Sequence, residues 1–153
     1  MKRILAFILA AAFLFAGCGT DTSAGSASAA TAEEIFNKLS EDLSSVDLQS
    51  GDLVVKLLGL EEDSVVSCNA AFAKDGGPGL VIVLESKTED DALKAGERMK
   101  YYLTTLQNSA VQYSPADVDI LKKGYVYTSG NCSVLYVGEN VEDAKKDLAK
   151  LLN

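Results

Sequence analysis

The segment Leu80-Val81-Ile82-Val83-Leu84 decides the fold of this chain of 153 residues. All five residues are apolar, whereas a strand with one face in water would alternate apolar and polar residues. An unbroken apolar run of this length predicts a central β-strand that other elements cover on both faces, or nearly so. We therefore expect the rest of the domain to build outward from residues 80–84.

Turn-forming residues divide the chain around this segment into two predicted hairpins. Residues 64–73 alternate in polarity, which is typical of a half-buried strand, and a glycine-rich turn at 75–79 leads into the central strand. A second pair of strands spans residues 122–128 and 132–137, joined by a turn at Ser129-Gly130-Asn131. These segments predict a sheet of four strands.

Apolar residues at helical spacing predict four helices and one short helical turn. The first helix follows a capping box, in which Thr31 is the N-cap and Glu34 is the third helical residue. Gly59 stops the second helix, and Gly96 in the long third helix is expected to allow a close approach to the sheet. Asn140 is expected to cap the last helix. The predicted bounds are 32 to 43 or 45, 53–58, 88–107 and a helix that follows 140, with the helical turn at 118–121.

The predicted element order is α-α-β-β-α-β-β-α. Two hairpins that flank a helix favour one sheet with the helices packed on one of its faces. The expected fold class is therefore α+β, a two-layer domain with a mostly antiparallel four-stranded sheet.

The first 18 residues have the pattern of a bacterial secretion signal. Lys2 and Arg3 precede the uncharged apolar run Ile4–Phe15, which is shorter than the ~17–25 residues of a membrane-spanning helix. Phe15-Ala16-Gly17-Cys18 resembles the lipobox of bacterial lipoproteins. That resemblance implies lipidation of the Cys18 thiol, with chains such as palmitate, and removal of residues 1–17 as a signal peptide. The alternatives are a cleaved signal peptide in which Cys18 is incidental, and an uncleaved anchor helix.

The mature chain is expected to consist of a tether and one domain. Residues 18–31 are small and, apart from Asp21, uncharged, which predicts a flexible tether behind the lipidated cysteine. Residues 32–153 are numerous enough to bury a core and to form a single domain. Removal of residues 1–17 takes away two basic residues and no acidic one, so the net charge changes from −8 to −10. This acidic balance argues against nucleic acid as a partner, and it is also typical of a soluble surface.

The sequence contains no histidine, which limits its chemistry. The usual general base near neutral pH, the commonest zinc ligand and every Ser-His or Cys-His nucleophilic pair are therefore absent. Asp117 and Asp119, beside Tyr113, are the strongest candidates for acid–base work, but carboxylates next to a turn are usually solvated. We therefore expect no catalytic residue, no metal site, no cofactor and no enzymatic activity.

Two cysteines besides Cys18 fall on predicted strands, Cys68 and Cys132. Disulfides form outside the cytoplasmic membrane, and a bond between these two would stabilise the domain by roughly 4 kcal/mol through the long loop that it closes. The alternative is that both are buried as small apolar side chains. The sequence leaves both readings open, because it does not place the two Cβ atoms.

The C-terminal half contains an arrangement that resembles a known family. The helix at 88–107, Tyr113-Ser114-Pro115 and the hairpin from 120 to 137 occur in that order and precede a closing helix. Together with the lipobox and the segment at 52–59, they resemble a family of small bacterial lipoproteins known as domain of unknown function 4358. The resemblance covers roughly residues 32–153. It implies a lipoprotein, and it brings no activity, substrate or catalytic residue.

These features predict a non-enzymatic interaction module, held by its lipid at the extracytoplasmic face of the cell membrane. The expected partners are the membrane, through the anchor, and an unidentified protein or component of the cell envelope. A sheet face or the pair Tyr125 and Tyr127 would contact the partner, although core packing explains the two tyrosines equally well. The alternative is a lipoprotein that binds a small ligand or an ion.

Overall fold

The computed structural model of the protein describes residues 30–43 and 45–152. The predicted signal peptide, Cys18 and most of the predicted tether lie outside these residues. Among the residues that are described, no helix combines the length and the apolar composition needed to cross a membrane.

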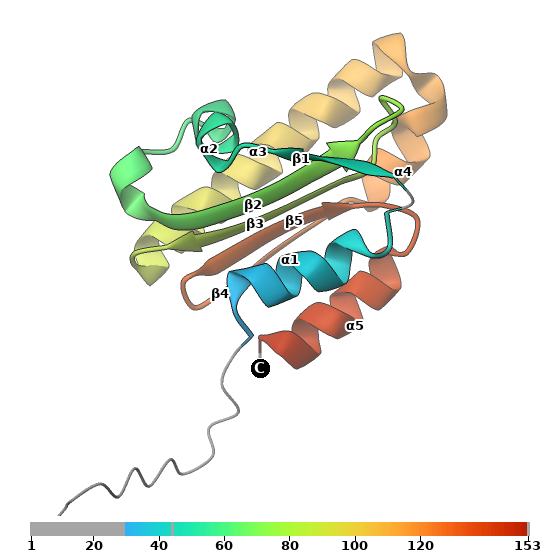
Figure 1. Cartoon of the computed structure of the whole chain (residues 1–153). Helices are drawn as coiled ribbons and strands as arrows, with labels where there is room; N and C mark the ends of the chain where they lie inside the picture. Colours follow the sequence, from blue (N-terminus) through green and yellow to red (C-terminus); the bar gives the residue numbers. More distant parts are fainter. Residues whose placement is uncertain (1–29, 44, 153) are drawn as a thin grey trace, which may run out of the picture.

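The described chain forms one five-stranded sheet with helices on both of its faces (Figure 1). All neighbouring strands are antiparallel, and their order across the sheet is β1-β2-β3-β5-β4. The strands are β1 (Val46–Gln49), β2 (Val65–Ala73), β3 (Leu80–Ser86), β4 (Tyr125–Ser129) and β5 (Cys132–Val137). The helices are α1 (Ala32–Ser40), α2 (Gly51–Leu58), α3 (Glu89–Tyr113), α4 (Val118–Lys123) and α5 (Val141–Leu151), with short 3-10 turns at Glu62–Ser64 and Pro115–Asp117.

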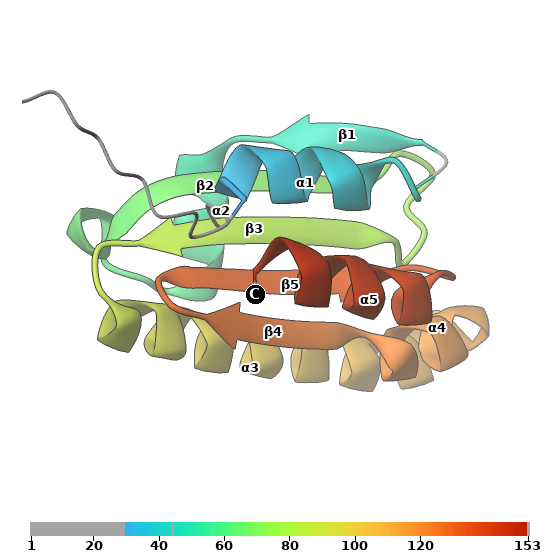
Figure 2. The ribbon, with the colours of Figure 1, turned by 90° about the horizontal axis from the view of Figure 1, so that it is seen from below.

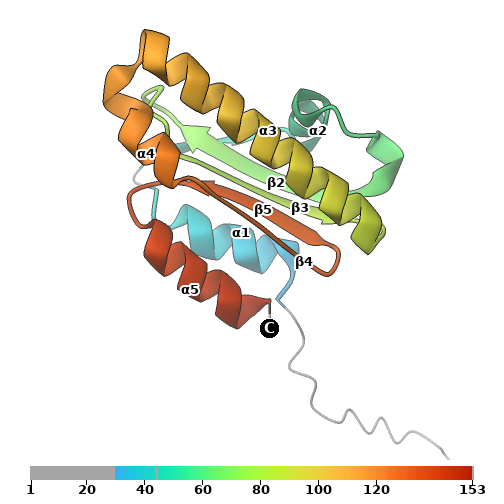
Figure 3. The same ribbon diagram turned by 180° about the vertical axis from the view of Figure 1, so that it is seen from behind.

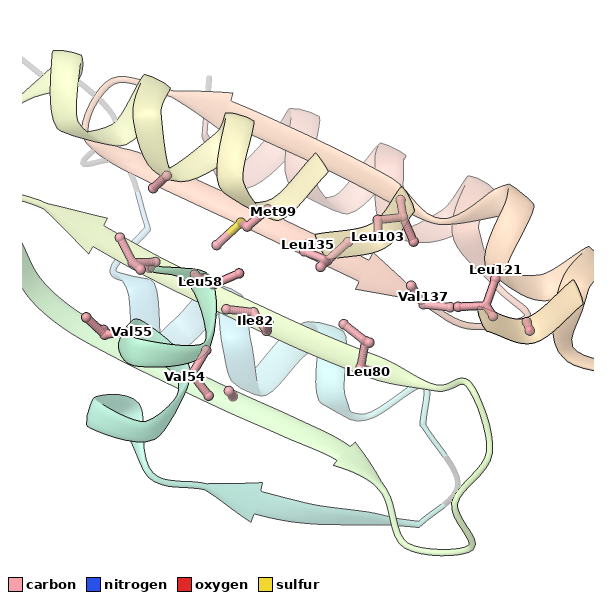
Figure 4. Close-up of a cluster of buried hydrophobic side chains, with 14 residues drawn as sticks. Val54, Val55, Leu58, Leu80, Ile82, Met99, Leu103, Leu121, Leu135 and Val137 are labelled. Carbon is pink, nitrogen blue, oxygen red and sulfur yellow. The ribbon is translucent and has the colours of Figure 1, made fainter. Parts of the chain in front are cut away.

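Strand β3 lies at the centre of the sheet and supplies side chains to two separate cores. Leu80, Ile82 and Leu84 point to the face covered by α2, α3 and α4, and they belong to the cluster drawn in Figure 4. Val81 and Val83 point to the opposite face, where they pack with α1 and α5. Figures 2 and 3 show the two helical layers on either side of the sheet. The prediction that residues 80–84 form a central, doubly covered strand is therefore confirmed.

The α+β class is also confirmed, but the predicted two-layer arrangement is wrong. The sheet has five strands rather than four, because residues 46–49 form an edge strand that pairs with β2. This segment, Val-Asp-Leu-Gln, alternates in polarity over only four residues, the minimum length at which alternation indicates a strand. Helices cover both faces rather than one, because an amphipathic pattern tells which side of a helix is buried and not which face of the sheet buries it.

Helix α1 begins with the predicted capping box. The Glu34 amide donates to the Thr31 hydroxyl at 3.2 Å, and the Thr31 amide donates to the Glu34 carboxylate at 2.8 Å. The Ala30 amide donates to the carbonyl of Leu151 at 3.0 Å, so the first described residue lies beside the end of α5. We refer to this edge of the domain as the Ala30 end. Strands β2 and β5 finish at the opposite edge, the distal end, which comprises residues 41–43, 45, 74–79 and 138–140 (Figure 2).

Helix α3 approaches the sheet closely at Gly96, as the sequence predicts. A Cβ atom at this position would collide with the hydroxyl oxygen of Thr128 on β4. Ser133 on β5 joins α3 to the sheet at the same place. Its hydroxyl donates to the Ala92 carbonyl at 2.7 Å and lies 3.1 Å from the Thr128 hydroxyl. The helix and the strand therefore fit together only while residue 96 has no side chain.

Gly96→Ala is accordingly expected to lower the free energy of unfolding by ~1–3 kcal/mol, because the added methyl group overpacks the contact with Thr128. In an exposed helix the same change would normally stabilise the protein by about 1 kcal/mol. Urea denaturation measures the difference, with the exposed Lys100→Ala on the same helix as the control. An increase in stability for Gly96→Ala would contradict the close approach.

Candidate functional site

Three connections meet at the distal end and surround an open pocket of about 240 Å³. Asp42 follows α1, Asp75 and Pro78 belong to the turn between β2 and β3, and Gly138 and Glu139 connect β5 to α5. Water occupies ~30 Å³ per molecule in the liquid, so the volume corresponds to roughly eight water molecules. The pocket is therefore larger than a single ion requires.

The charge of this distal pocket is entirely negative. Asp42, Asp75 and Glu139 line it, and no basic side chain does. The Asp75 carboxylate accepts a hydrogen bond from the Gly77 amide at 3.0 Å, which fixes the turn. Asp42 and Glu139 have no hydrogen bond or salt bridge within the described part of the chain. Such a surface attracts cations and repels phosphates and carboxylates.

The hydroxyl group of Tyr136 lies behind the wall of this pocket, against Gly138, and has no hydrogen-bond partner among the described residues. Tyr136 is 0% exposed, and its oxygen is the one buried side-chain polar atom without a partner in the part of the chain that the structure describes. The oxygen lies 2.5 Å from where a Cβ atom on Gly138 would be, and the same position is 3.1 Å from Leu43. Leu43 and Gly138 both line the pocket. An unsatisfied buried hydroxyl costs about 1–3 kcal/mol.

The surroundings of Tyr136 keep this hydroxyl protonated. Burial raises the pKa of Tyr136 to about 12, and the carboxylates of Asp42 and Glu139 add to the rise. The neutral phenol can donate one hydrogen bond and accept others. The Tyr136 hydroxyl neither donates nor accepts a hydrogen bond within the described structure.

Asn140 begins α5 beside the pocket, but it does not cap the helix with its side chain as predicted. Its carbonyl accepts the amides of Asp143 at 3.1 Å and Ala144 at 3.0 Å, and its side chain makes no capping hydrogen bond. The backbone angles of Asn140, φ −97° and ψ 40°, explain this difference, because a capping side chain needs an extended residue. The first turn of α5 is therefore left open toward the distal end.

A second hollow, of about 200 Å³, lies beside the distal pocket, and Pro78 lines both. We name it the tyrosine groove, because Tyr102 and Tyr113 on α3 line it with Leu106. Tyr113 is 81% exposed, which is unusual for an aromatic side chain. The groove offers apolar and aromatic contact area directly beside the acidic pocket.

The acid–base candidates of the sequence are only partly brought together. Asp117 lines the tyrosine groove with Tyr113, whereas Asp119 does not. Within residues 30–43 and 45–152, no group of three or more aspartate, glutamate or cysteine side chains is placed to hold a metal ion. The aspartates beside Tyr113 therefore do not form a set of side chains suited to acid–base catalysis, and the described residues offer no set suited to metal binding.

Tyr125 and Tyr127 pack mainly within the domain. Their rings stack with centroids 6.1 Å apart, and both contact the core cluster beneath α1 and α5. The ammonium of Lys145 on α5 lies 5.1 Å from the centre of the Tyr125 ring. These contacts favour core packing, which is one of the two explanations that the sequence offers for this pair.

The structure does not join Cys68 to Cys132, and both thiols are free. Cys68 packs against the α2 and α3 side of the sheet, whereas Cys132 belongs to the core on the α1 and α5 side. Strand β3 also lies between their strands. The two cysteines therefore do not form a disulfide in this fold. Cys132 is a buried small side chain and Cys68 is partly buried. Cys18, the predicted lipidation site, lies outside the described residues.

No protein-family model matches the chain, and no significant match to a curated protein or a solved structure was found. The resemblance to the bacterial lipoprotein family stays a prediction. The function must therefore be argued from the residues themselves.

Sequence reasoning did not find the distal pocket. Asp42, Asp75 and Glu139 lie in separate connections, far apart in the chain. The sequence places Asp42 at the end of the first predicted helix, and the other two between predicted elements. Tyr136 lies on a predicted strand, where aromatic residues are common. Only the order of strands in the sheet brings the four residues to one end of the domain.

The burial of the two free thiols predicts how stability changes with pH. Burial raises the pKa of Cys68 and of Cys132 to about 11, with Asp52 acting on the first and Glu85 on the second. Stability should be unaffected by these thiols below about pH 9 and should fall as the pH rises from there toward 11, because the unfolded state loses its protons first. The loss is expected to reach about 2–3 kcal/mol per thiol and is measured by urea denaturation under reducing conditions.

The double variant Cys68→Ala/Cys132→Ala should show a flatter fall over the same pH range, since only the tyrosines and lysines then contribute. Alkylation followed by mass spectrometry gives an independent check. Two thiols that react only after the protein is unfolded agree with the structure. A pair that reacts only after reduction would contradict it.

Proposed function

We propose that this protein is a membrane-anchored extracytoplasmic lipoprotein that acts as a non-enzymatic interaction module at the bacterial cell envelope. One observation carries the proposal. Ala30, which joins the domain to the predicted tether, lies at one end of the sheet, and the distal pocket with its tyrosine groove lies at the other. A lipid at Cys18 would hold the domain from the end opposite its most distinctive surface.

The dimensions are consistent with this arrangement. The predicted tether from Cys18 to Ala30 would reach roughly 20 Å if it behaves as a flexible coil. The six residues of β5, which run from the Ala30 end to the distal end, add about 20 Å at 3.3 Å per residue. The distal surface can therefore extend well beyond the lipid head groups and reach components of the envelope.

The composition supports a binding role rather than catalysis. The chain has no histidine, and the described residues contain no cluster suited to a metal ion. Carboxylates line the distal pocket and a protonated phenol lies behind its wall, which are groups that hold a cation well.

The alternative is a lipoprotein that binds a small ligand or an ion through the same pocket. Its volume of about 240 Å³ and its uniform negative charge favour this second candidate. The two functions share one surface, and they differ in whether the occupant belongs to a protein or envelope component or is free in solution.

Replacement of the predicted lipidation site tests the anchor. Cys18→Ser should abolish lipid attachment, because serine lacks the thiol that accepts the lipid. The variant is expected to move from the detergent-rich to the aqueous phase on detergent phase separation, or to keep an uncleaved signal peptide. Intact mass spectrometry distinguishes these forms. A variant that still carries the lipid mass of the parent protein would contradict the lipobox assignment.

Site-specific photo-crosslinking in the native host tests the interaction. A photoreactive residue in place of the exposed Asp75, at the distal end, should capture a defined envelope component, whereas the same residue in place of the exposed Asp63, at the Ala30 end, should not. Equal capture from both positions, or none from the distal end with a full-length anchored protein, would count against the proposal. A different domain behind the same tether is the further control.

A further inference from the structure

The carboxylates of the distal pocket and the hydroxyl of Tyr136 form one unsatisfied polar set. Asp42 and Glu139 line the pocket from two different connections, and their carboxylates make no hydrogen bond or salt bridge among the described residues. The Tyr136 oxygen lies against Gly138, between the strand and the loop that carries Glu139. Two independent observations, a cluster of negative charge and a buried polar atom without a partner, thus point to the same place.

The chemistry of this set excludes several classes of occupant. Anions are disfavoured because three carboxylates and no basic side chain line the pocket. A metal ion held by three protein carboxylates is disfavoured because, in the described part of the chain, no group of three or more aspartate, glutamate or cysteine side chains is placed to hold one. The pocket also has room for about eight waters, far more than a monatomic ion occupies. An organic cation is therefore the class of occupant that fits the distal pocket best.

A primary ammonium group matches the acceptors better than other organic cations do. It carries three N–H donors, no acceptor and a full positive charge. The carboxylates of Asp42 and Glu139 and the oxygen of Tyr136 offer three acceptors, one for each of its donors. A guanidinium is planar and favours side-by-side pairing with one carboxylate, and a quaternary ammonium has no donors.

We propose that the distal pocket binds a primary ammonium group carried on a flexible chain, with Asp42, Glu139 and the Tyr136 oxygen as its acceptors. Asp75 contributes charge from the opposite wall while it stays bonded to Gly77. The side chain of Leu43, which is partly buried, must turn aside to open the path to the hydroxyl. The inference rests on the proposed function, since it names the chemistry by which the module recognises its partner. The ammonium comes from a free amine or from a lysine side chain.

The first experiment titrates the full chain in neutral maltoside micelles with 1,5-diaminopentane, because zwitterionic detergents carry ammonium groups themselves. The backbone amide of Gly138, followed by NMR, should shift and saturate with a dissociation constant on the order of millimolar. 1,5-Pentanediol has the same length without charge and should cause no saturable shift. Equal binding of the diol would overturn the proposal.

Variants then test the three acceptors. Asp42→Asn, Glu139→Gln and Tyr136→Phe should each weaken diamine binding roughly three- to tenfold, because each removes one acceptor. Asp63→Asn removes the same charge at the Ala30 end and should leave binding unchanged at constant ionic strength. Tyr136→Phe keeps the apolar packing, so its fold is expected to survive. Unchanged binding by Tyr136→Phe, or an equal loss in Asp63→Asn, would overturn the proposal.

A second arm identifies the source of the ammonium. A short lysine peptide and its side-chain-acetylated form are compared as competitors of the diamine. Competition by the unmodified peptide alone supports a lysine of a protein partner, whereas diamine binding without peptide competition supports a free amine. Failure of both probes overturns the inference. Crosslinking from position 75 that persists in Asp42→Asn/Glu139→Gln would show that the inference fails while the proposed interaction stands.

Discussion

The architecture depends on the need to cover strand β3 on both faces. Its five consecutive apolar side chains alternate across the sheet, and all are 5% exposed or less. Helices on one side alone would leave Val81 and Val83, or their neighbours, in water, at a cost of about 2 kcal/mol for each large side chain. Helices α1 and α5 therefore close one core, while α2, α3 and α4 close the other.

This constraint also determines where the chain can build a site. Both faces of the central strands are occupied by packed helices, so only the sheet edges and the two ends are open to partners. At the distal end three connections approach one another because β3 starts there and β2 and β5 finish there. Asp42, Asp75 and Glu139 line one pocket for that reason, and the Tyr136 hydroxyl lies behind its wall, in the core beneath α1 and α5.

The sequence predicts the features that local chemistry determines. The apolar run of β3, the capping box at Thr31 and the close approach at Gly96 are all confirmed, because each depends on residues adjacent in the chain or on one helix face. Strand β1 was not predicted because its alternation in polarity extends over only four residues. The choice of sheet face for each helix, the separation of Cys68 from Cys132 and the whole distal pocket depend on strand order, which no local pattern encodes.

The hydroxyl of Tyr136 is the part of this residue that the fold does not use. A phenylalanine would fill the same space in the core and would bring no unsatisfied group. The aromatic ring therefore explains the packing, and the hydroxyl needs a partner from outside the described contacts. That partner must also be compatible with the carboxylates of Asp42 and Glu139, because both act on the same oxygen. A donor with positive charge meets both conditions, which is why the pocket points to a cation more strongly than either its acidity or its buried hydroxyl does alone.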